Sequence, residues 1–406
     1  MASKVDLAII GAGPHALTLV THLLKKRQKI RSKIAVFDPS GGWLHQWKQQ
    51  FAALGIPHLR SPAAHHPDPN AFALRKFAEP RPHELFAPYD LPGTKLFDDF
   101  CGDVIRRWNL ENAVTPGEIT CIEPLPHSFR PWLHLWLKDG KSIIARRVVL
   151  ATGSSQFQIP DWVSQIQTPY PQDRLCHSQL IDLRKLQLAG ERILIVGGGL
   201  TSGHLAIGAL SLMAKVDIFI RRQLQEKIFD AEPGWLGPKY LKAFFAEPNF
   251  HNRWRMIKEA RNGGSITPAM GVQLRRERRQ GQVRIYENTQ VVKAEWLGNY
   301  WLIKTNKGEQ YEYDRIWLST GTHFDVHSQP LLENILQAYP ISVVNGLPVL
   351  EHNLCWHGCP LFLMGGLAAL QIGPTARNLS GARMASEKLE KAIIKSAVIP
   401  YQAILA

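Results

Sequence analysis

The order of apolar runs along the chain predicts two copies of one strand–helix–strand unit. Residues 5–10 form a short apolar run typical of a buried parallel strand, and residues 17–24 continue with helix-compatible apolar spacing. A second apolar run at 192–196 is followed by another helical stretch at 204–215. Such alternation is typical of parallel sheets covered by helices. Each helix leads into a further predicted strand, at 33–38 and at 216–222.

A glycine-rich turn follows the first apolar run. Gly11, Gly13 and Ala16 form the pattern G-x-G-x-x-A, with Pro14 inside it. Gly11 permits a tight turn, Gly13 lets the backbone approach a pyrophosphate, and Ala16 is small enough for close helix–strand packing. The phosphates would lie at the helix N-terminus, where free N–H groups and the helix dipole favour negative charge. We therefore expect these four residues to bind a dinucleotide.

An acidic residue ends the second predicted strand. Asp38 lies 22 residues beyond Ala16, where a carboxylate meets the hydroxyls of an adenosine ribose in dinucleotide-binding units. A surface aspartate at a strand end is the alternative, but the order of strand, turn, helix and strand favours ribose binding. Trp43 and Trp47 follow in a glycine-containing segment, and both suit packing near a planar ring.

The glycine motif recurs in the second unit as G-x-G-x-x-S at 197–202. Each unit then ends with an apolar strand and a Thr-Gly turn. The second motif glycine precedes this turn by 140 residues in the first copy and by 122 in the second. An internal repeat on this scale is stronger evidence than either motif alone. The residues expected at the cofactors are Gly197, Gly199, Thr201 and Ser202, with Gly153 and Gly321 at the two Thr-Gly turns.

The two units differ at the end of their second strand. Where the first has Asp38, the second has Arg221 and Arg222. A carboxylate repels a 2′-phosphate, whereas guanidinium groups pair with it through charge-assisted hydrogen bonds. We therefore predict that the second unit binds NADPH and that the first binds a cofactor with an unphosphorylated adenosine ribose. Two arginines on the surface of a basic protein are the alternative.

Short strands with hairpin signals lie between each second strand and its Thr-Gly turn. The predicted fold class is therefore α/β, with two Rossmann-like dinucleotide-binding domains, each with an inserted antiparallel β meander. The expected division is a first domain at 1–165, a second at 166–315, and a return to the first at 316–406. The strands are predicted at 119–123, 132–137 and 143–150, and then at 283–286, 290–296, 300–305 and 311–318.

Two segments interrupt this repeat, and a third follows it. Residues 51–115 are rich in proline and are predicted to be ordered but irregular, with a helix at 97–108. Residues 229–280 are predicted to be helical, and 360–366 and 375–397 form a last strand and helix. The helix N-terminus would place partial positive charge near a flavin. The candidates near the flavin are Arg60, Ser61, His65 and His177, with Gly366, Gln371, Gly373 and Pro374 as cofactor-binding residues.

The composition limits the kinds of partner that the protein is expected to bind, but it does not determine the function. The 48 Lys and Arg exceed the 34 Asp and Glu, and the net charge of +14 suits phosphorylated cofactors or acidic substrates. We expect no nucleic-acid binding, because no ordered basic–aromatic pattern occurs. The 5 scattered cysteines and adjacent His65 and His66 do not complete a metal site, so no metal is expected. Without a signal peptide or a transmembrane run, a cytoplasmic location is expected, with a homo-oligomer possible.

Two dinucleotide folds with a C-terminal return strand resemble the two-domain flavoproteins that bind FAD and NAD(P)H. Three features are similar to single-component flavin monooxygenases, which include the lysine and ornithine N-hydroxylases. They are the G-W-x-x-x-W segment with the Pro-rich segment after it, the 229–280 insertion with Pro238-x-Tyr240, and His177-Ser178. The last pair matches the end of the fingerprint F-x-G-x-x-x-H-[ST], although Pro171 and Asp173 replace its Phe and Gly.

The resemblance implies FAD and NADPH as cofactors, and a small-molecule substrate and O₂ as partners. The implied reaction is hydroxylation of an amine or another soft nucleophile after NADPH has reduced the flavin. Two alternatives stay open. One is an NADPH-dependent flavin reductase that passes electrons to a quinone or a protein acceptor, and the other is a catalytically silent flavin-binding protein.

Overall fold

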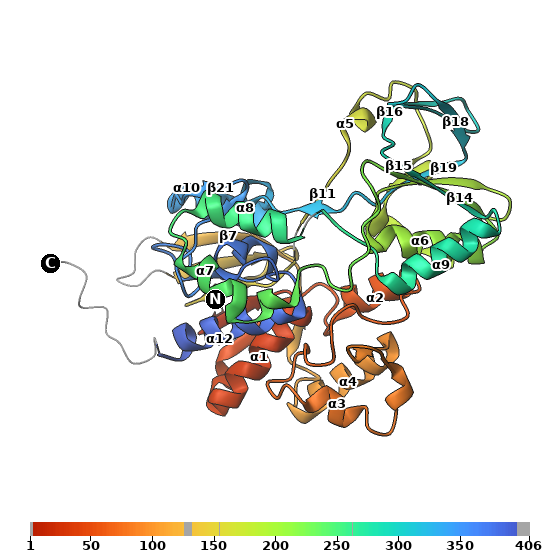
Figure 1. The fold of residues 1–406 in the computed structure, drawn as a ribbon. Coiled ribbons are helices and arrows are strands. Elements are labelled where there is room, and N and C mark those ends of the chain that lie inside the picture. The colour runs from red at the N-terminus through yellow and green to blue at the C-terminus, as the bar shows by residue number, and fades with distance from the viewer. Residues whose placement is uncertain (1–2, 126–131, 154, 262, 396–406) are drawn as a thin grey trace.

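The computed structural model describes residues 3–125, 132–153, 155–261 and 263–395, and it contains two parallel sheets (Figure 1). The first sheet is wholly parallel and places the first apolar run between two apolar neighbours. α1 (Pro14–Lys26) follows that central strand and packs against α12 (Leu379–Lys395). In spatial order the strands are β23 (Leu361–Leu363), β10 (Val148–Leu150), β2 (Leu7–Ile10), β3 (Ile34–Asp38) and β6 (Val114–Pro116).

The first unit also contains a four-stranded sheet. Two strands that were predicted as continuous are each divided between this sheet and the parallel one. Residues 5–10 and 143–150 each divide into two strands, because the chain leaves this sheet and enters the parallel one. β1 pairs with β9, whereas β2 pairs with β10. The apolar pattern of a sequence does not reveal such a change of partner strand. In spatial order the strands are β1 (Ser3–Val5), β9 (Ser142–Ala145), β8 (Trp132–Leu137) and β7 (Ile119–Leu125).

The second unit repeats this arrangement. Its parallel sheet carries a three-stranded antiparallel meander, and α6 (Leu200–Ser211) follows the central strand. The predicted strand 311–318 also divides between the two sheets. The parallel strands are β12 (Leu175–His177), β19 (Arg315–Leu318), β13 (Arg192–Val196), β14 (Lys215–Ile220) and β15 (Val283–Glu287), and the meander has β16 (Val291–Trp296), β17 (Trp301–Thr305) and β18 (Gln310–Tyr313). The predicted α/β class is confirmed.

Only part of the helical insertion predicted at 229–280 packs against the second unit. α7 (Pro238–Ala246) and α8 (Phe250–Arg261) contribute to the apolar core of the first unit, whereas α9 (Pro268–Arg279) packs against α6. The chain therefore crosses between the units near 158, 228, 264 and 323. This packing differs from the expected division, because 231–260 belong to the first core and β19 carries the second unit past residue 315.

The remaining elements are short and mostly belong to the first unit. The helix predicted at 97–108 is confirmed as α4 (Thr94–Arg107). The predicted C-terminal helix begins at Leu379, and its end at 397 lies outside the described residues. The other helices are α2 (His45–Ala53), α3 (Ala73–Phe77), α5 (Asp161–Ser164), α10 (Glu333–Ala338) and α11 (Ala369–Ile372), and the other strands are β4 (Leu85–Phe86), β5 (Leu91–Pro92), β11 (Gln156–Phe157), β20 (Thr322–His323), β21 (Val343–Val344) and β22 (Leu347–Pro348).

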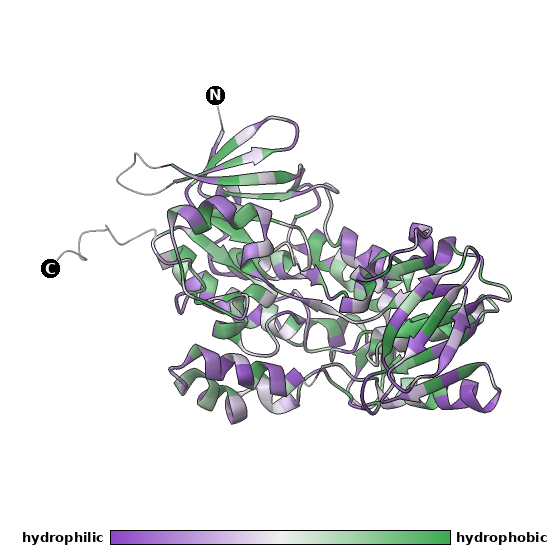
Figure 2. Ribbon diagram, turned by 90° about the horizontal axis from the view of Figure 1, so that it is seen from above, coloured by the Kyte–Doolittle hydropathy of each residue, from purple (hydrophilic) through white to green (hydrophobic). Residues whose placement is uncertain are grey.

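Apolar residues concentrate in the sheets and on the inner faces of the helices, and polar residues colour the outer helices (Figure 2). The first unit has one large core, and the second has separate cores on the two faces of its parallel sheet. None of the described helices combines the length and the apolar composition needed to cross a bilayer.

Because of two buried histidines, we expect the stability of the protein to depend on pH. Burial lowers the pKa of His22 and of His66 to about 4 from the ordinary 6.5. The unfolded chain therefore binds protons at a pH where the folded protein does not. The free energy of unfolding is therefore unaffected by these two histidines above pH 6.5. It decreases as the pH falls towards 4, by up to about 3 kcal/mol for each histidine.

Urea unfolding between about pH 7.5 and about pH 4.5 measures this loss. The double variant His22→Gln/His66→Gln should show a weaker pH dependence than the natural protein. A His83→Gln variant is the control, because His83 is exposed. Equal pH dependence in the double variant and the natural protein would contradict the assignment.

Candidate functional site

The first glycine turn has the geometry that a dinucleotide requires. Gly11 has a φ of +96°, and a Cβ atom there would lie 2.8 Å from the carbonyl oxygen of Ala151. Gly13 is the N-cap of α1, and a Cβ atom there would meet no protein atom within 4 Å. Pro14 and buried Ala16 follow in the first turn of α1. The free N–H groups of α1 therefore face open space at Gly13.

Asp38 ends β3 next to this turn. One carboxylate oxygen accepts a hydrogen bond from the backbone N–H of Ala12 at 3.0 Å, and the other accepts from the backbone and hydroxyl of Ser40. These contacts hold the carboxylate at the carboxyl edge of the sheet, as ribose binding requires.

The two tryptophans after Asp38 contribute to the core, which differs from the expectation. Trp43 is only 7% exposed, and its indole N–H donates to the backbone carbonyl of Leu110 at 2.8 Å. Trp47 packs against Phe51 and Phe97. Trp43 is therefore too deeply buried to stack on a cofactor, and it anchors the segment after β3.

The second glycine turn repeats the first. Gly197 has a φ of +138°, and a Cβ atom there would lie 2.3 Å from the carbonyl oxygen of Ser319. Gly199 is the N-cap of α6 and faces open space. Thr201 lines the cleft described below, whereas Ser202 is buried and matches Ala16 in providing close packing. Gly153 and Gly321, at the Thr-Gly turns, also have positive φ values and face open space.

A cleft of about 1670 Å³ separates the two units. Gly197 and Gly199 line one part of it, together with Arg221 and Arg222. Arg222 donates to the carbonyl oxygen of Gly264, and exposed Arg221 makes no ion pair with any described residue. A binding surface with glycines at a helix N-terminus and guanidinium groups beside it fits a phosphorylated dinucleotide.

Of the four candidates near the flavin, only Arg60 and His177 line the cleft. Ser61 does not line it, and the segment containing His65 packs against the first-unit helices: Thr21 in α1 donates to the carbonyl oxygen of Pro67, and Arg383 in α12 donates to that of Pro69.

Arg60 connects the two units rather than presenting a free guanidinium. It donates to Asp230 at 2.6 Å, to the carbonyl oxygens of Lys227 and Ile228, and to Ser265. These residues lie where the chain crosses between the units. Burial lowers the pKa of Arg60, and the carboxylate of Asp230 opposes this shift. Arg60 therefore helps to fix the position of one unit relative to the other.

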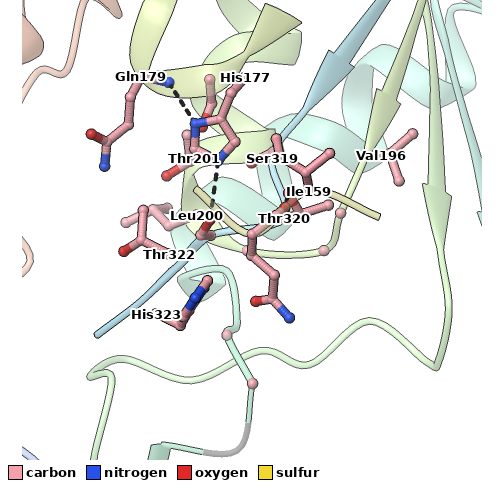
Figure 3. Close-up of a pocket in the computed structure, with 18 of the residues that line it drawn as sticks. Ile159, His177, Gln179, Val196, Leu200, Thr201, Ser319, Thr320, Thr322 and His323 are labelled. Atoms are coloured by element: carbon pink, nitrogen blue, oxygen red, sulfur yellow. Dashed lines mark hydrogen bonds between the residues drawn. The ribbon is translucent and has the colours of Figure 1, made fainter. Parts of the chain in front are cut away.

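His177 also has a structural role. Its ring stacks on Phe157, Nε2 lies 3.0 Å from the carbonyl oxygen of Gly321, and Nδ1 accepts from the backbone N–H of Gln179 (Figure 3). Both ring nitrogens are thus engaged, which requires the neutral form with the proton on Nε2. Burial lowers the pKa of His177 and favours that form. His177 holds the second Thr-Gly turn in place.

The C-terminal candidates divide between the cleft and the core. Gly366 and Pro374 line the cleft, and Gly373 has a φ of +100° just before Pro374. Gln371 is buried and donates to the carbonyl oxygen of Leu350, so it does not face a cofactor. Ala376, just before the cleft-lining Arg377, is buried in the apolar core of the first unit, which also contains Ala12 and Ala16 of the first glycine turn. The first glycine turn and this part of the cleft wall therefore share one apolar core.

Sequence reasoning missed one wall of the cleft. Trp254, Ile257, Lys258 and Arg261 lie on one face of α8 and line the cleft, and Arg377 lines it from the first unit. Their spacing of three and four residues along 254–261 was the available signal. Pro238 and Tyr240, which suggested the substrate side, lie outside the cleft, and Tyr240 donates to Glu232.

The fold and these two turns resemble those of FAD/NAD(P)-binding proteins. Residues 8–155 match the family model described as FAD-NAD(P)-binding, so this part of the chain is an FAD/NAD(P)-binding domain. No curated protein sequence shows a significant match to the chain.

Solved structures share the fold over nearly the whole chain at low identity. One is the ornithine N-hydroxylase from Kutzneria sp. 744 with reduced FAD, NADP⁺ and L-ornithine (TM-score 0.78, 16% identity, 97% of this chain and 100% of that one). Another is the FAD-bound cadaverine monooxygenase of desferrioxamine biosynthesis from Erwinia amylovora (0.76, 15%, 100% and 97%). A third is the bacillithiol disulfide reductase from Staphylococcus aureus (0.63, 12%, 97% and 99%).

These likenesses confirm the predicted resemblance at the level of the fold. The chain has a flavin-dependent NAD(P)H monooxygenase-like fold, and its structural relatives include both monooxygenases and a reductase. Because a fold hosts different reactions, the reaction must be argued from the site.

Proposed function

We propose that this chain is an oxidoreductase in which NADPH reduces FAD and one atom of O₂ is then added to an amine or another soft nucleophile. One observation supports this proposal most strongly: a single cleft is lined by the second glycine turn on one side and, on the other, by residues of the 374–377 segment, which shares the apolar core of the first unit with α1. NADPH and FAD held at these two turns would share the cleft. A substrate could reach both from the same opening.

The chain's own residues would bind and orient the cofactors. Gly11, Gly13 and Asp38 would hold FAD, and Gly199 and Arg221 would hold NADPH. When bound, FAD supplies hydride acceptance and oxygen activation, so that one oxygen atom enters the substrate, the other leaves as water, and NADPH provides two electrons. Arg60 and His177 would keep the two units in register, because each fixes a segment that crosses between them.

Measuring the products formed from O₂ and NADPH distinguishes this function from the alternatives. The FAD-loaded protein is supplied with NADPH, O₂ and a panel of amines and sulfides, and NADPH oxidation, hydrogen peroxide and oxidised product are measured together. A monooxygenase should give product with one substrate and release less peroxide in its presence. NADPH oxidation that requires a quinone, with no oxygenated product, would identify a reductase instead. Failure of NADPH to reduce the flavin would leave only a binding protein.

The arginine pair should decide the choice of nicotinamide cofactor. In Arg221→Ala/Arg222→Ala, loss of charge-assisted hydrogen bonds to a 2′-phosphate should raise the KM for NADPH by about tenfold to a hundredfold. The KM for NADH should change little, because NADH lacks that phosphate. Steady-state kinetics with both cofactors measure the effect. The single variant Arg221→Ala is the cleaner test, since Arg222 also bonds to Gly264. An unchanged preference would remove the arginines from the site.

A further inference from the structure

The part of the cleft near α8 is positively charged. Arg60 and Arg261 share a single carboxylate, that of Asp230, with nitrogen–oxygen distances of 2.6 and 3.3 Å. Burial alone would raise the pKa of Asp230, yet Arg261 and Arg60 hold it below its ordinary value. Asp230 is therefore fully engaged. Arg261 also donates to the carbonyl oxygen of Pro374, so it is locked in place.

Two further cations in this part of the cleft form no salt bridge with a carboxylate of the described residues, although the charge of Asp230 raises the pKa of Arg377. Arg377 is accessible from inside the cleft although protein surrounds it on most sides, and it forms no ion pair there. Burial, followed by the charge of Arg261, lowers the pKa of Arg377 to about 10, so it stays charged at neutral pH. Lys258 is exposed, and its ammonium lies 4.9 Å from the centre of the Trp254 ring.

The same wall is apolar between these charges. Trp254 and Ile257 lie on the cleft face of α8, and Phe324, Leu347 and Ala369 line the cleft as well. Asp325 is the other carboxylate in this part of the cleft, and it accepts from the backbone N–H of His327. The part of the cleft near α8 therefore offers aromatic and aliphatic surface with an excess of fixed positive charge.

From these residues we infer that the substrate is an organic anion with an apolar or aromatic body, its carboxylate attracted by the positive charges of Arg377 and Lys258 and its body packed against Trp254 and Ile257. This inference rests on the proposed function only in naming the ligand a substrate. Amines such as the cadaverine and L-ornithine named for the structural relatives carry a cationic group at neutral pH. A dication with no carboxylate, like cadaverine, would be repelled by this wall.

The test compares probes that share a ring and differ in charge. Naphthaleneacetate and naphthylmethylamine are titrated by calorimetry into the FAD-loaded protein with NADP⁺ present, so that neither cofactor site is open. Naphthaleneacetate should bind at least about tenfold tighter than the amine. Arg377→Met and Lys258→Met should each weaken binding of the anion by about tenfold and leave binding of the amine unchanged or improved. Arg255→Met, on the outer face of α8, is the matched control and should change neither.

Equal or tighter binding of the amine would overturn the inference. So would loss of FAD from Arg377→Met together with unchanged naphthaleneacetate binding in Lys258→Met, because the guanidinium would then serve the flavin. The readout needs no turnover, which separates it from the proposed function. Charge-dependent binding in a protein whose flavin NADPH cannot reduce would refute the monooxygenase proposal and leave an anion-binding cleft.

Discussion

Replacing Gly13 with leucine is expected to give a folded protein that no longer retains FAD. A Cβ atom at Gly13 would meet no protein atom within 4 Å, and the φ of −77° is open to any residue, so the fold should tolerate the change. The space it fills is the one in front of the α1 N-terminus, where the pyrophosphate would lie. We expect FAD affinity to fall by at least about a hundredfold. The ratio of flavin to protein after reconstitution measures the effect.

The chain offers a closely matched control for this variant. Gly237 is also the N-cap of an α-helix, precedes a proline, and faces open space. It lies at the start of α7 and follows a short 3₁₀ helix, Pro233–Leu236, rather than a strand of a parallel sheet. Gly237→Leu should keep FAD and should melt at a temperature similar to that of the Gly13 variant. Retention of FAD by Gly13→Leu, or equal loss of FAD from both variants, would refute the assignment of the first turn.

The corresponding change in the second unit should separate the two cofactors. Gly199→Leu fills open space at the N-terminus of α6 and should leave FAD bound, because Gly199 belongs to the other sheet. Reduction of the bound flavin by NADPH should slow by at least about a hundredfold. Reduction by dithionite, which needs no binding site, should be unchanged.

Rapid mixing under anaerobic conditions measures the flavin reduction rate in Gly199→Leu and in Gly237→Leu. A normal rate with NADPH in Gly199→Leu would show that the nicotinamide cofactor binds elsewhere. Loss of FAD from this variant would show that the two units do not divide the cofactors as proposed.

Local patterns were sufficient to predict the parts of the fold in which neighbouring residues act together. Gly11 and Gly197 need positive φ values next to a strand, and Asp38 is the last residue of a short strand, so motif spacing carried that information. The divided strands at 5–10 and 143–150 could not be predicted in this way. A buried strand looks the same in sequence whichever sheet it pairs with.

The candidate site shows the same limit. Arg60 and His177 were identified as residues near the flavin, but their partners, Asp230 and Gly321, lie 170 and 144 residues away. A residue's chemistry therefore suggested a site, whereas the long-range partner shows the role: Arg60 links the two units, and His177 holds the second Thr-Gly turn. Trp254 and Lys258 were missed because only the return of α8 to the first unit places them at the cleft.

The central claim is that the two glycine turns serve one redox reaction across one cleft. Anaerobic titration of the FAD-loaded natural protein with NADPH tests it most directly. The account predicts that one equivalent of NADPH fully reduces the bound flavin and that NADH does so far more slowly. A flavin that stays oxidised with excess NADPH, yet is reduced by dithionite, would contradict it.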